Sequence, residues 1–380
     1  MKKKKILFIS SSRADYGVLR NLILETQKIN KETYLLVTGS HLSSQFGNTI
    51  KEIQKDKIKK IIKKKILDKN FRDNRVSQYM AKSITTTSSV LKKKKPDVIV
   101  ILGDRYELLG CAIAAMILRI PITHIHGGEL TIGAFDDSIR HSITKLSHLH
   151  FPSHEKYRKR LVQLGENPKS IFNFGALGSH AISKLKFIKK IRIEKILKTK
   201  LKKKIILVTF HPVTLEKNMA KSHIRNLIKF LSTQNDSSII FTSPNFDNES
   251  NTLKKEILDF VKKKSNVHFY HSLGSEIYHS LMKIAHLVIG NSSSGIVETP
   301  SFGIRTINIG NRQKGRIISN NIVNCDYSYK SICKAYLKLR KSFKKPSNPF
   351  LKKNTPKIIA KKILNFKFDI KKSFFDVKMK

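Results

Sequence analysis

Acidic and basic side chains gather at two points between residues 98 and 141, each directly after a short apolar run. The first point reads Gly-Asp-Arg at 103–105, and the second reads His-Gly-Gly-Glu at 126–129. Positioned carboxylates transfer protons, and basic groups beside them hold anions. The sequence therefore predicts acid and base chemistry on a small molecule. The candidate residues are Asp104, Arg105, His126, Glu129, Asp136 and Asp137.

A strand, a helix and a second strand are expected to position these groups. Residues 97–102 form a β-branched run of strand length, residues 106–118 carry apolar side chains at helical spacing, and residues 121–125 form another short apolar run. Open α/β sheets bind ligands beyond the carboxyl ends of their strands. The polar residues stand at those ends. Asp136 and Asp137 open a further helix, where an Asp can also serve only as a cap.

The second half of the chain repeats this alternation. Strands are expected at 205–210, 238–242, 267–270, 286–289 and 304–309, again followed by polar residues. The run Asn-Ser-Ser-Ser-Gly at 291–295 precedes a predicted helix at 296–300, so its hydroxyls and backbone N–H groups favour an anion such as a pyrophosphate. Glu298 either accepts hydrogen bonds from ribose hydroxyls or is a first-turn acid. The candidates of this half are His211, Asn245, His271, Ser292, Ser293, Ser294, Glu298 and Arg312.

The first strand, expected at residues 6–9, leads into a loop of three serines and Arg13. Hydroxyls and a guanidinium before a helix can hold phosphate. This loop lacks glycines at the offsets of a dinucleotide fingerprint. We therefore interpret it as a weak phosphate signal.

The length of 380 residues favours two domains. We expect an α/β domain at 1–180, a second at 181–350, and a helical segment at 351–380 that closes the fold. Alternating strands and helices predict parallel sheets covered on both faces. In the first domain, further strands are expected at 34–37, 149–151 and 171–174, and a helix at 153–164 is expected to be capped by Ser153. The three cysteines show neither metal spacing nor an even disulfide framework, which fits a cytoplasmic protein. We expect no metal and no cofactor.

The formal net charge of +48 raises the question of nucleic acid or membrane binding. The basic residues are 60 Lys and 15 Arg, and the Lys stand in scattered runs. Arg is the residue expected for bidentate phosphate or base recognition. The longest apolar stretch, 108–118, is too short to span a bilayer. We expect partners to include neither nucleic acid nor a membrane.

Several ordered motifs together resemble the hydrolysing UDP-N-acetylglucosamine 2-epimerases of sialic acid biosynthesis. The motifs are SSRADYG (11–17), LGDRYE (102–107), HIHGGE (124–129), DDSIRHSITKLSHLHF (136–151), FHP (210–212), GNSSSGIVETPSFG (290–303), INIGNRQKGR (307–316) and SNPF (347–350). The resemblance implies two Rossmann-like domains of glycosyltransferase-B type, an active site in the cleft between them, and a homodimer or homotetramer. It implies that UDP contacts Ser292, Ser293 and Glu298, with Arg13, Asn245, His271 and Arg312 as further contacts.

The family reaction implied by this resemblance eliminates UDP across C1 and C2 to give a glycal, and then adds water with inversion at C2 to give N-acetylmannosamine. We assign acid and base roles to Asp104, Glu129 and Asp136, with Asp137 as a substitute for Asp136. His211 and Arg13 are assigned to the departing pyrophosphate. The chain has His126 where some relatives have Glu.

Three other functions fit parts of this pattern. A sister epimerase would act on UDP-2,4-diacetamido-trideoxyglucose, the bacillosamine-type substrate of legionaminic acid pathways, and would need a less polar pocket near C4 and C6 of the sugar. A glycosyltransferase of the same fold would pass the sugar to an acceptor. A protein that binds RNA or DNA would lose affinity steeply with salt.

Overall fold

The computed structural model describes residues 4–68, 75–131, 135–183, 185–213, 216, 218–244, 249–341, 343 and 346–377. The chain forms two compact units. Unit 1 comprises residues 1–129, 136–181 and 350–380, and unit 2 comprises residues 130–135 and 182–349. The segment 351–380, predicted as a helical segment that closes the fold, groups with unit 1 and contains a helix at Thr355–Asn365.

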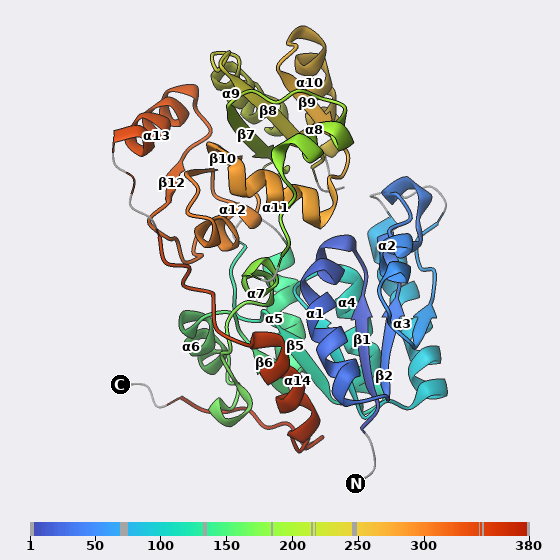
Figure 1. The fold of residues 1–380 in the computed structure, drawn as a ribbon. Helices are drawn as coiled ribbons and strands as arrows, with labels where there is room; N and C mark the ends of the chain where they lie inside the picture. The colour runs from blue at the N-terminus through green and yellow to red at the C-terminus, as the bar shows by residue number, and fades with distance from the viewer. Residues whose placement is uncertain are drawn as a thin grey trace. The chain divides into compact units, whose positions relative to one another are not determined.

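Unit 1 contains a six-stranded parallel sheet in the order β3-β2-β1-β4-β5-β6 (Figure 1). Its strands are β1 (Ile6–Ser10), β2 (Thr33–Val37), β3 (Ile61–Lys63), β4 (Val98–Leu102), β5 (Ile122–Ile125) and β6 (Leu149–Phe151). Its helices are α1 (Arg13–Ile29), α2 (Ile50–Lys55), α3 (Val76–Lys94), α4 (Tyr106–Ile117), α5 (Asp136–Leu146), α6 (Glu155–Gln163) and α14 (Thr355–Asn365), and α7 (Leu177–Ser183) leads towards unit 2.

Alternate side chains of β1 serve two hydrophobic cores, because successive strand residues face opposite sides of a sheet. Ile6 and Phe8 pack in the cluster that contains residues of α1 and α14. Leu7 and Ile9 pack in the cluster that contains residues of α3, α4 and α5. Helices therefore cover both faces, and Figure 1 shows the red helix α14 beside the blue helix α1.

Unit 2 contains a second six-stranded parallel sheet in the order β12-β11-β10-β7-β8-β9. Its strands are β7 (Lys204–Thr209), β8 (Ser237–Thr242), β9 (Val267–Tyr270), β10 (Leu287–Gly290), β11 (Thr306–Ile309) and β12 (Ile322–Cys325). Its helices are α8 (Lys190–Leu197), α9 (Ala220–Leu231), α10 (Ser250–Lys263), α11 (Gly274–Ile284), α12 (Ser294–Val297) and α13 (Tyr329–Lys341). Both sheets thus have the doubly wound order, which binds ligands where the strand order reverses.

Four local predictions differ from the structure. The strands β3 and β12 were not predicted. Residues 171–174 were predicted as a strand but contribute one bridge, between Ile171 and His150. The predicted helix at 296–300 is instead the single turn α12, followed by a 3-10 turn at Thr299–Ser301. Ser153 was predicted to cap the helix that follows it, but the N-cap of α6 is His154.

Candidate active site

The strand order of unit 1 reverses between β1 and β4, and the predicted acidic cluster lies along this part of the sheet. Asp104 follows β4, and His126 to Glu129 follow the neighbouring strand β5. Asp136 and Asp137 are the first two residues of α5. The predicted strands and helix start are therefore confirmed, and they bring these residues to the carboxyl edge of one sheet.

Arg140 of α5 joins two of the predicted carboxylates. Its guanidinium hydrogen-bonds to Asp104 and lies 3.4 Å from Oε2 of Glu129. The Arg140 side chain is 4% exposed, whereas that of Asp104 is 23% exposed. Because one buried cation serves both acids, they can stand close together without the full cost of like-charge repulsion. Arg140 was not among the predicted site residues, although its place one turn after Asp136 was a usable signal.

Glu129 is held from its other side by Ser153 and His126. The Ser153 hydroxyl donates to Oε1 of Glu129 at 2.6 Å, and Nδ1 of His126 lies 3.5 Å from the same oxygen. Ser153 is thus a partner of a site carboxylate instead of the predicted helix cap. His126 has a φ of +64°, which is uncommon for a residue with a side chain.

Arg105 forms an ion pair inside unit 1. Its Nη2 lies 2.9 Å from Oε1 of Glu107, whose side chain is fully buried. Burial acts to lower the pKa of Arg105, but the charges of Glu107 and Asp15 outweigh burial and raise it. The guanidinium therefore stays charged beside the switch point of the sheet, where its remaining role as a substrate contact is still a prediction.

The donors of Ser11 and Ser12, in the loop after β1, are occupied by a carboxylate of the protein. The carboxylate of Asp15 accepts from the backbone N–H groups and the hydroxyls of both serines, at 2.7–3.1 Å. These bonds include the capping box at the start of α1. Phosphate binding by this loop stays a prediction. Arg13 is exposed at the first position of α1.

In unit 2 the strand order reverses between β7 and β10, and the side chain of Asn291 bridges this point. Its Oδ1 accepts from the N–H of His211 at 2.7 Å, and its Nδ2 donates to the carbonyl of His211 at 2.8 Å. The carbonyl of Asn291 in turn accepts from Gln313 at 2.9 Å and from Arg312 at 3.4 Å. The predicted residues His211 and Arg312 are thus connected through one residue, Asn291: His211 through the side chain of Asn291 and Arg312 through its backbone carbonyl.

The His211 side chain is buried. Burial, and then the nearby charge of Arg312, lower its pKa well below the ordinary value for histidine. The imidazole is therefore neutral near pH 7, and it can offer a hydrogen bond but no positive charge to a departing phosphate.

Gly290 permits β10 to approach β7 closely. Its φ is +144°, and a Cβ atom there would lie 1.9 Å from the carbonyl oxygen of Thr209. The serines that follow are connected to α11, because Ser294 Oγ lies 2.7 Å from Tyr278 OH and 3.1 Å from Ser292 Oγ. Ser293 precedes α12. The hydroxyls thus gather where an anion was predicted, although a single helical turn carries little dipole.

Glu298 pairs with a histidine that the sequence analysis did not single out. Nε2 of His279 lies 3.2 Å from Oε2 of Glu298, and Nδ1 of His279 donates to the carbonyl of Ser275 at 2.7 Å. Burial acts to lower the pKa of His279, but the charge and hydrogen bond of Glu298 outweigh burial and raise it. Glu298 directly follows α12, so it is not a first-turn acid of that helix, and it is paired with a histidine instead.

Three further predicted residues have few or no described contacts with the other candidates. Asn245 lies outside the described residues. His271 is exposed after β9, and its ring makes an edge contact with Phe269 at 5.1 Å. Asp137 lies 3.6 Å from Nε2 of His141 on the next turn of α5.

Within the described ranges, no group of three or more His, Cys, Asp or Glu residues is arranged to hold a metal ion. In the same part of the chain, no helix is both long enough and apolar enough to cross a membrane.

Comparison with known proteins identifies relatives over most of the chain. Residues 24–364 match the family model described as UDP-N-acetylglucosamine 2-epimerase. The GDP/UDP-N,N'-diacetylbacillosamine 2-epimerase (hydrolyzing) of Campylobacter jejuni is 47% identical over 333 residues, which are 86% of this chain and 85% of that protein. The UDP-N-acetylglucosamine 2-epimerase of Neisseria meningitidis serogroup B is 33% identical over 87% of this chain and 85% of that protein.

Among solved structures, the UDP-GlcNAc 2-epimerase from Neisseria meningitidis bound to UDP-GlcNAc has a TM-score of 0.79 and 19% identity, covering 95% of this chain and all of that one. The likeness confirms the predicted fold class, two parallel α/β domains of glycosyltransferase-B type. The chain belongs to the UDP-N-acetylglucosamine 2-epimerase family, as a hydrolysing enzyme that acts on a UDP-sugar.

Proposed function

We propose that the enzyme hydrolyses UDP-N,N'-diacetylbacillosamine with inversion at C2, releasing UDP and the 2,4-diacetamido-trideoxy-mannose sugar. The observation that carries this proposal is the 47% identity to the Campylobacter jejuni bacillosamine-type enzyme, against 33% to the Neisseria meningitidis UDP-N-acetylglucosamine enzyme. UDP-N-acetylglucosamine was the first substrate predicted from the sequence motifs, and the bacillosamine-type sugar was the alternative. The identities favour the reverse order.

In the first half of the proposed reaction, a carboxylate removes the C2 proton while the C1–O bond to UDP breaks, which leaves a C1–C2 double bond. Asp104 is the favoured base, because its carboxylate is more exposed than that of Glu129 and is paired with Arg140. Glu129, with its Ser153 and His126 partners, is the candidate for the second proton transfer. Asp136 or Asp137 is a further acid or base at the start of α5.

In the second half, water adds to the double bond. Its oxygen joins C1, and C2 receives a proton on the face opposite to the one that lost it. The hydroxyls of Ser292 and Ser294, with Arg312, are proposed to hold the pyrophosphate that leaves, and His211 to donate a neutral hydrogen bond to it. Glu298, oriented by His279, is proposed to accept from the ribose hydroxyls.

Parallel turnover of two substrates tests the proposal. Purified full-length enzyme is incubated in D₂O with UDP-N,N'-diacetylbacillosamine or UDP-N-acetylglucosamine, and released UDP and sugar are measured. A site shaped for the C4 acetamido and C6 methyl groups should favour the first substrate by about 100-fold or more in kcat/KM, because a hydroxyl then meets no partner. The product should carry deuterium at C2.

Two outcomes would contradict this reading. A higher kcat/KM for UDP-N-acetylglucosamine would make that sugar the substrate, as the sequence motifs first predicted. Transfer of the sugar to an acceptor without deuterium at C2 would indicate a glycosyltransferase. A third arm with the GDP-linked sugar measures the base preference, and we expect the UDP sugar to be the better substrate.

A further inference from the structure

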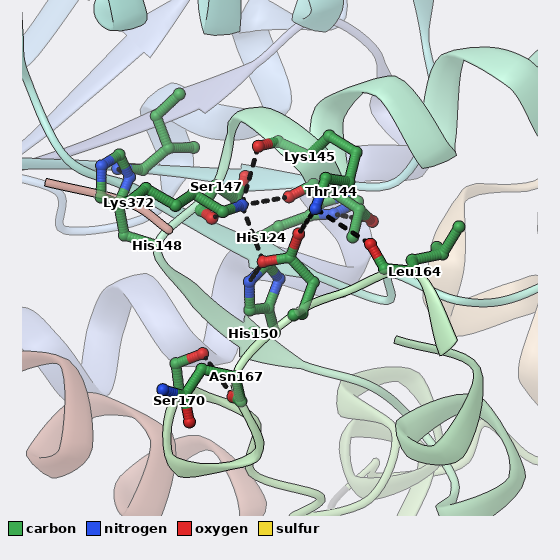
Figure 2. Close-up of polar contacts among 12 residues, drawn as sticks. His124, Thr144, Lys145, Ser147, His148, His150, Leu164, Asn167, Ser170 and Lys372 are labelled. Atoms are coloured by element: carbon green, nitrogen blue, oxygen red, sulfur yellow. Dashed lines mark hydrogen bonds and ion pairs between the residues drawn. The ribbon is translucent and has the colours of Figure 1, made fainter. Parts of the chain in front are cut away.

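A fully buried histidine, His124, lies in β5 beneath the acidic cluster, and the proposed mechanism does not use it. Its Nε2 is 2.8 Å from the carbonyl oxygen of Gly103, the residue before Asp104. Its Nδ1 is 3.1 Å from the hydroxyl of Thr144, and Figure 2 shows these two side chains together. One ring therefore contacts both the loop after β4 and the helix α5.

The partners of the ring fix its tautomer. A carbonyl oxygen only accepts hydrogen bonds, so Nε2 must carry the proton that faces Gly103. Burial lowers the pKa of His124, the hydrogen bond to Gly103 acts against burial, and the neighbouring His150, His126 and His141 add to the lowering, which brings the pKa to about 3. The ring is therefore neutral, and Nδ1 accepts the Thr144 hydroxyl proton.

The backbone leaves space for this arrangement at Gly127. A Cβ atom on Gly127 would lie 2.9 Å from Nδ1 of His124 and 3.0 Å from Oγ1 of Thr144. Both contacts are tighter than ordinary van der Waals distances, so a side chain there would push the ring off its partners. The glycine in the motif His-Gly-Gly-Glu thus has a packing reason connected to His124.

Thr144 stands four residues after Arg140, on the same face of α5. Arg140 binds the carboxylate of Asp104, and Gly103 is the neighbour of Asp104. We propose that His124 is a positioning residue, which ties the Gly103 carbonyl to Thr144 and so holds Asp104 and Arg140 in the alignment that the C2 proton transfer needs. This inference rests on the proposed role of Asp104.

Two substitutions of the same residue separate the two hydrogen bonds. In His124→Gln the longer amide can place its NH₂ where Nε2 donates to Gly103, while the shorter amide of His124→Asn reaches only the Nδ1 position. We expect kcat to fall by about 100-fold in His124→Asn, because a misplacement of about 1 Å costs that much. His124→Gln should recover at least tenfold of this loss, with KM and UDP affinity within about threefold of the parent in both.

Thr144 supplies a matched pair that leaves the histidine in place. Thr144→Val removes the hydroxyl at nearly constant shape, and Thr144→Ser keeps it. We expect kcat to fall by about tenfold in Thr144→Val, as for one lost hydrogen bond, and to recover in Thr144→Ser. Equal kcat values for Val and Ser, or for Asn and Gln at position 124, would overturn the positioning role.

A measurement without substrate keeps this inference separate from the proposed function. In ¹⁵N-histidine NMR spectra, the signal absent from His124→Gln should be the neutral Nε2–H tautomer and should not titrate between pH 5 and 8. A ring that titrates in this range, or that carries its proton on Nδ1, would refute the proposal. The kinetic arms use whichever UDP-sugar the parent enzyme turns over, so a wrong substrate assignment leaves them valid.

Discussion

Replacement of Lys372 by Met should loosen the carboxyl end of α5. The ammonium of Lys372 donates to three carbonyls there, those of Thr144 at 3.2 Å, Lys145 at 2.7 Å and Ser147 at 2.5 Å (Figure 2). It also lies 2.7 Å from Oε2 of Glu166. The carbonyl of Thr144 also accepts from the N–H of Ser147 at 3.0 Å, and a cation beside the carboxyl end of a helix is favourable.

The magnitude follows from what the substitution leaves behind. Glu166 is 1% exposed, but it keeps Lys145 at 2.8 Å and His150 at 2.9 Å. Breaking a fully buried ion pair costs about 3–5 kcal/mol. Because Lys372 is 21% exposed and Glu166 retains two partners, we expect a loss of about 2 kcal/mol in the free energy of unfolding of unit 1.

Hydrogen exchange and urea unfolding measure this loss. The amides of residues 140–147 should exchange about 30-fold faster in Lys372→Met, which is the same 2 kcal/mol, and the urea midpoint by circular dichroism should fall. Lys371→Met is the control, since that neighbouring side chain is exposed, and should stay within about 0.5 kcal/mol. Unchanged exchange in α5 with Lys372→Met would refute the capping argument.

Three other predictions follow from individual contacts. Asp104→Asn should lower kcat by about 10²–10⁴-fold with UDP affinity nearly unchanged, measured by turnover and calorimetry, and unchanged turnover would remove Asp104 from the mechanism. Gly290→Ala should abolish soluble expression because its Cβ would overlap the carbonyl of Thr209, whereas Gly178→Ala, with open space around it, should express normally. Burial acts to raise the pKa of Glu166, but its hydrogen bond to a histidine and two ammonium groups lower it to about 2. Its stabilising contribution is therefore complete above about pH 4.5 and is lost as the pH falls towards 2, so Glu166→Gln should flatten the acid side of a stability profile.

The central strands could be predicted because they are buried on both faces. Residues 98–102 read Val-Ile-Val-Ile-Leu, and every one is buried in β4. The strands β3 and β12 are the outer strands of their sheets, and each pairs with one neighbour. Lys63 and Asn324 interrupt their short apolar runs, so the pattern resembles a surface loop. The outer strand β9 was predicted at 267–270, so the interrupted apolar pattern, and not the outer position alone, hid β3 and β12.

The site could be predicted in place but not in its internal contacts. Polar residues after β4, β5, β7 and β10 stand where parallel sheets bind ligands, and this much follows from the order of elements. The sequence did not reveal that Asp15 takes up the donors of the serine loop, or that Ser153 binds Glu129 instead of capping a helix. Both outcomes depend on which of several possible partners is nearest after folding.

Residues that only position other site residues give a different and weaker signal in the sequence. His124 and Glu107 are polar side chains with no exposure in an otherwise apolar strand and helix. Most buried polar groups form hydrogen bonds inside the protein, so a buried His or Glu points to a partner group whose position it fixes. In this chain His124 holds a backbone carbonyl, and Glu107 holds Arg105. The same test applied to the sequence, an isolated His or Glu inside an apolar run, would have added both to the candidates.

The two sheets share one strand order but carry different chemistry at their switch points. Unit 1 places carboxylates there. Arg140 contacts both Asp104 and Glu129, so one cation reduces the repulsion between the two carboxylates. Unit 2 places the hydroxyls of Ser292 and Ser294 and the guanidinium of Arg312 there, which are donors suited to a diphosphate. In the proposed elimination, the carboxylates of unit 1 take and return the C2 proton, and the donors of unit 2 hold the diphosphate that leaves C1. The test of this division is that Asp104→Asn should affect turnover and not UDP affinity, because Asp104 is assigned to the proton and not to the diphosphate.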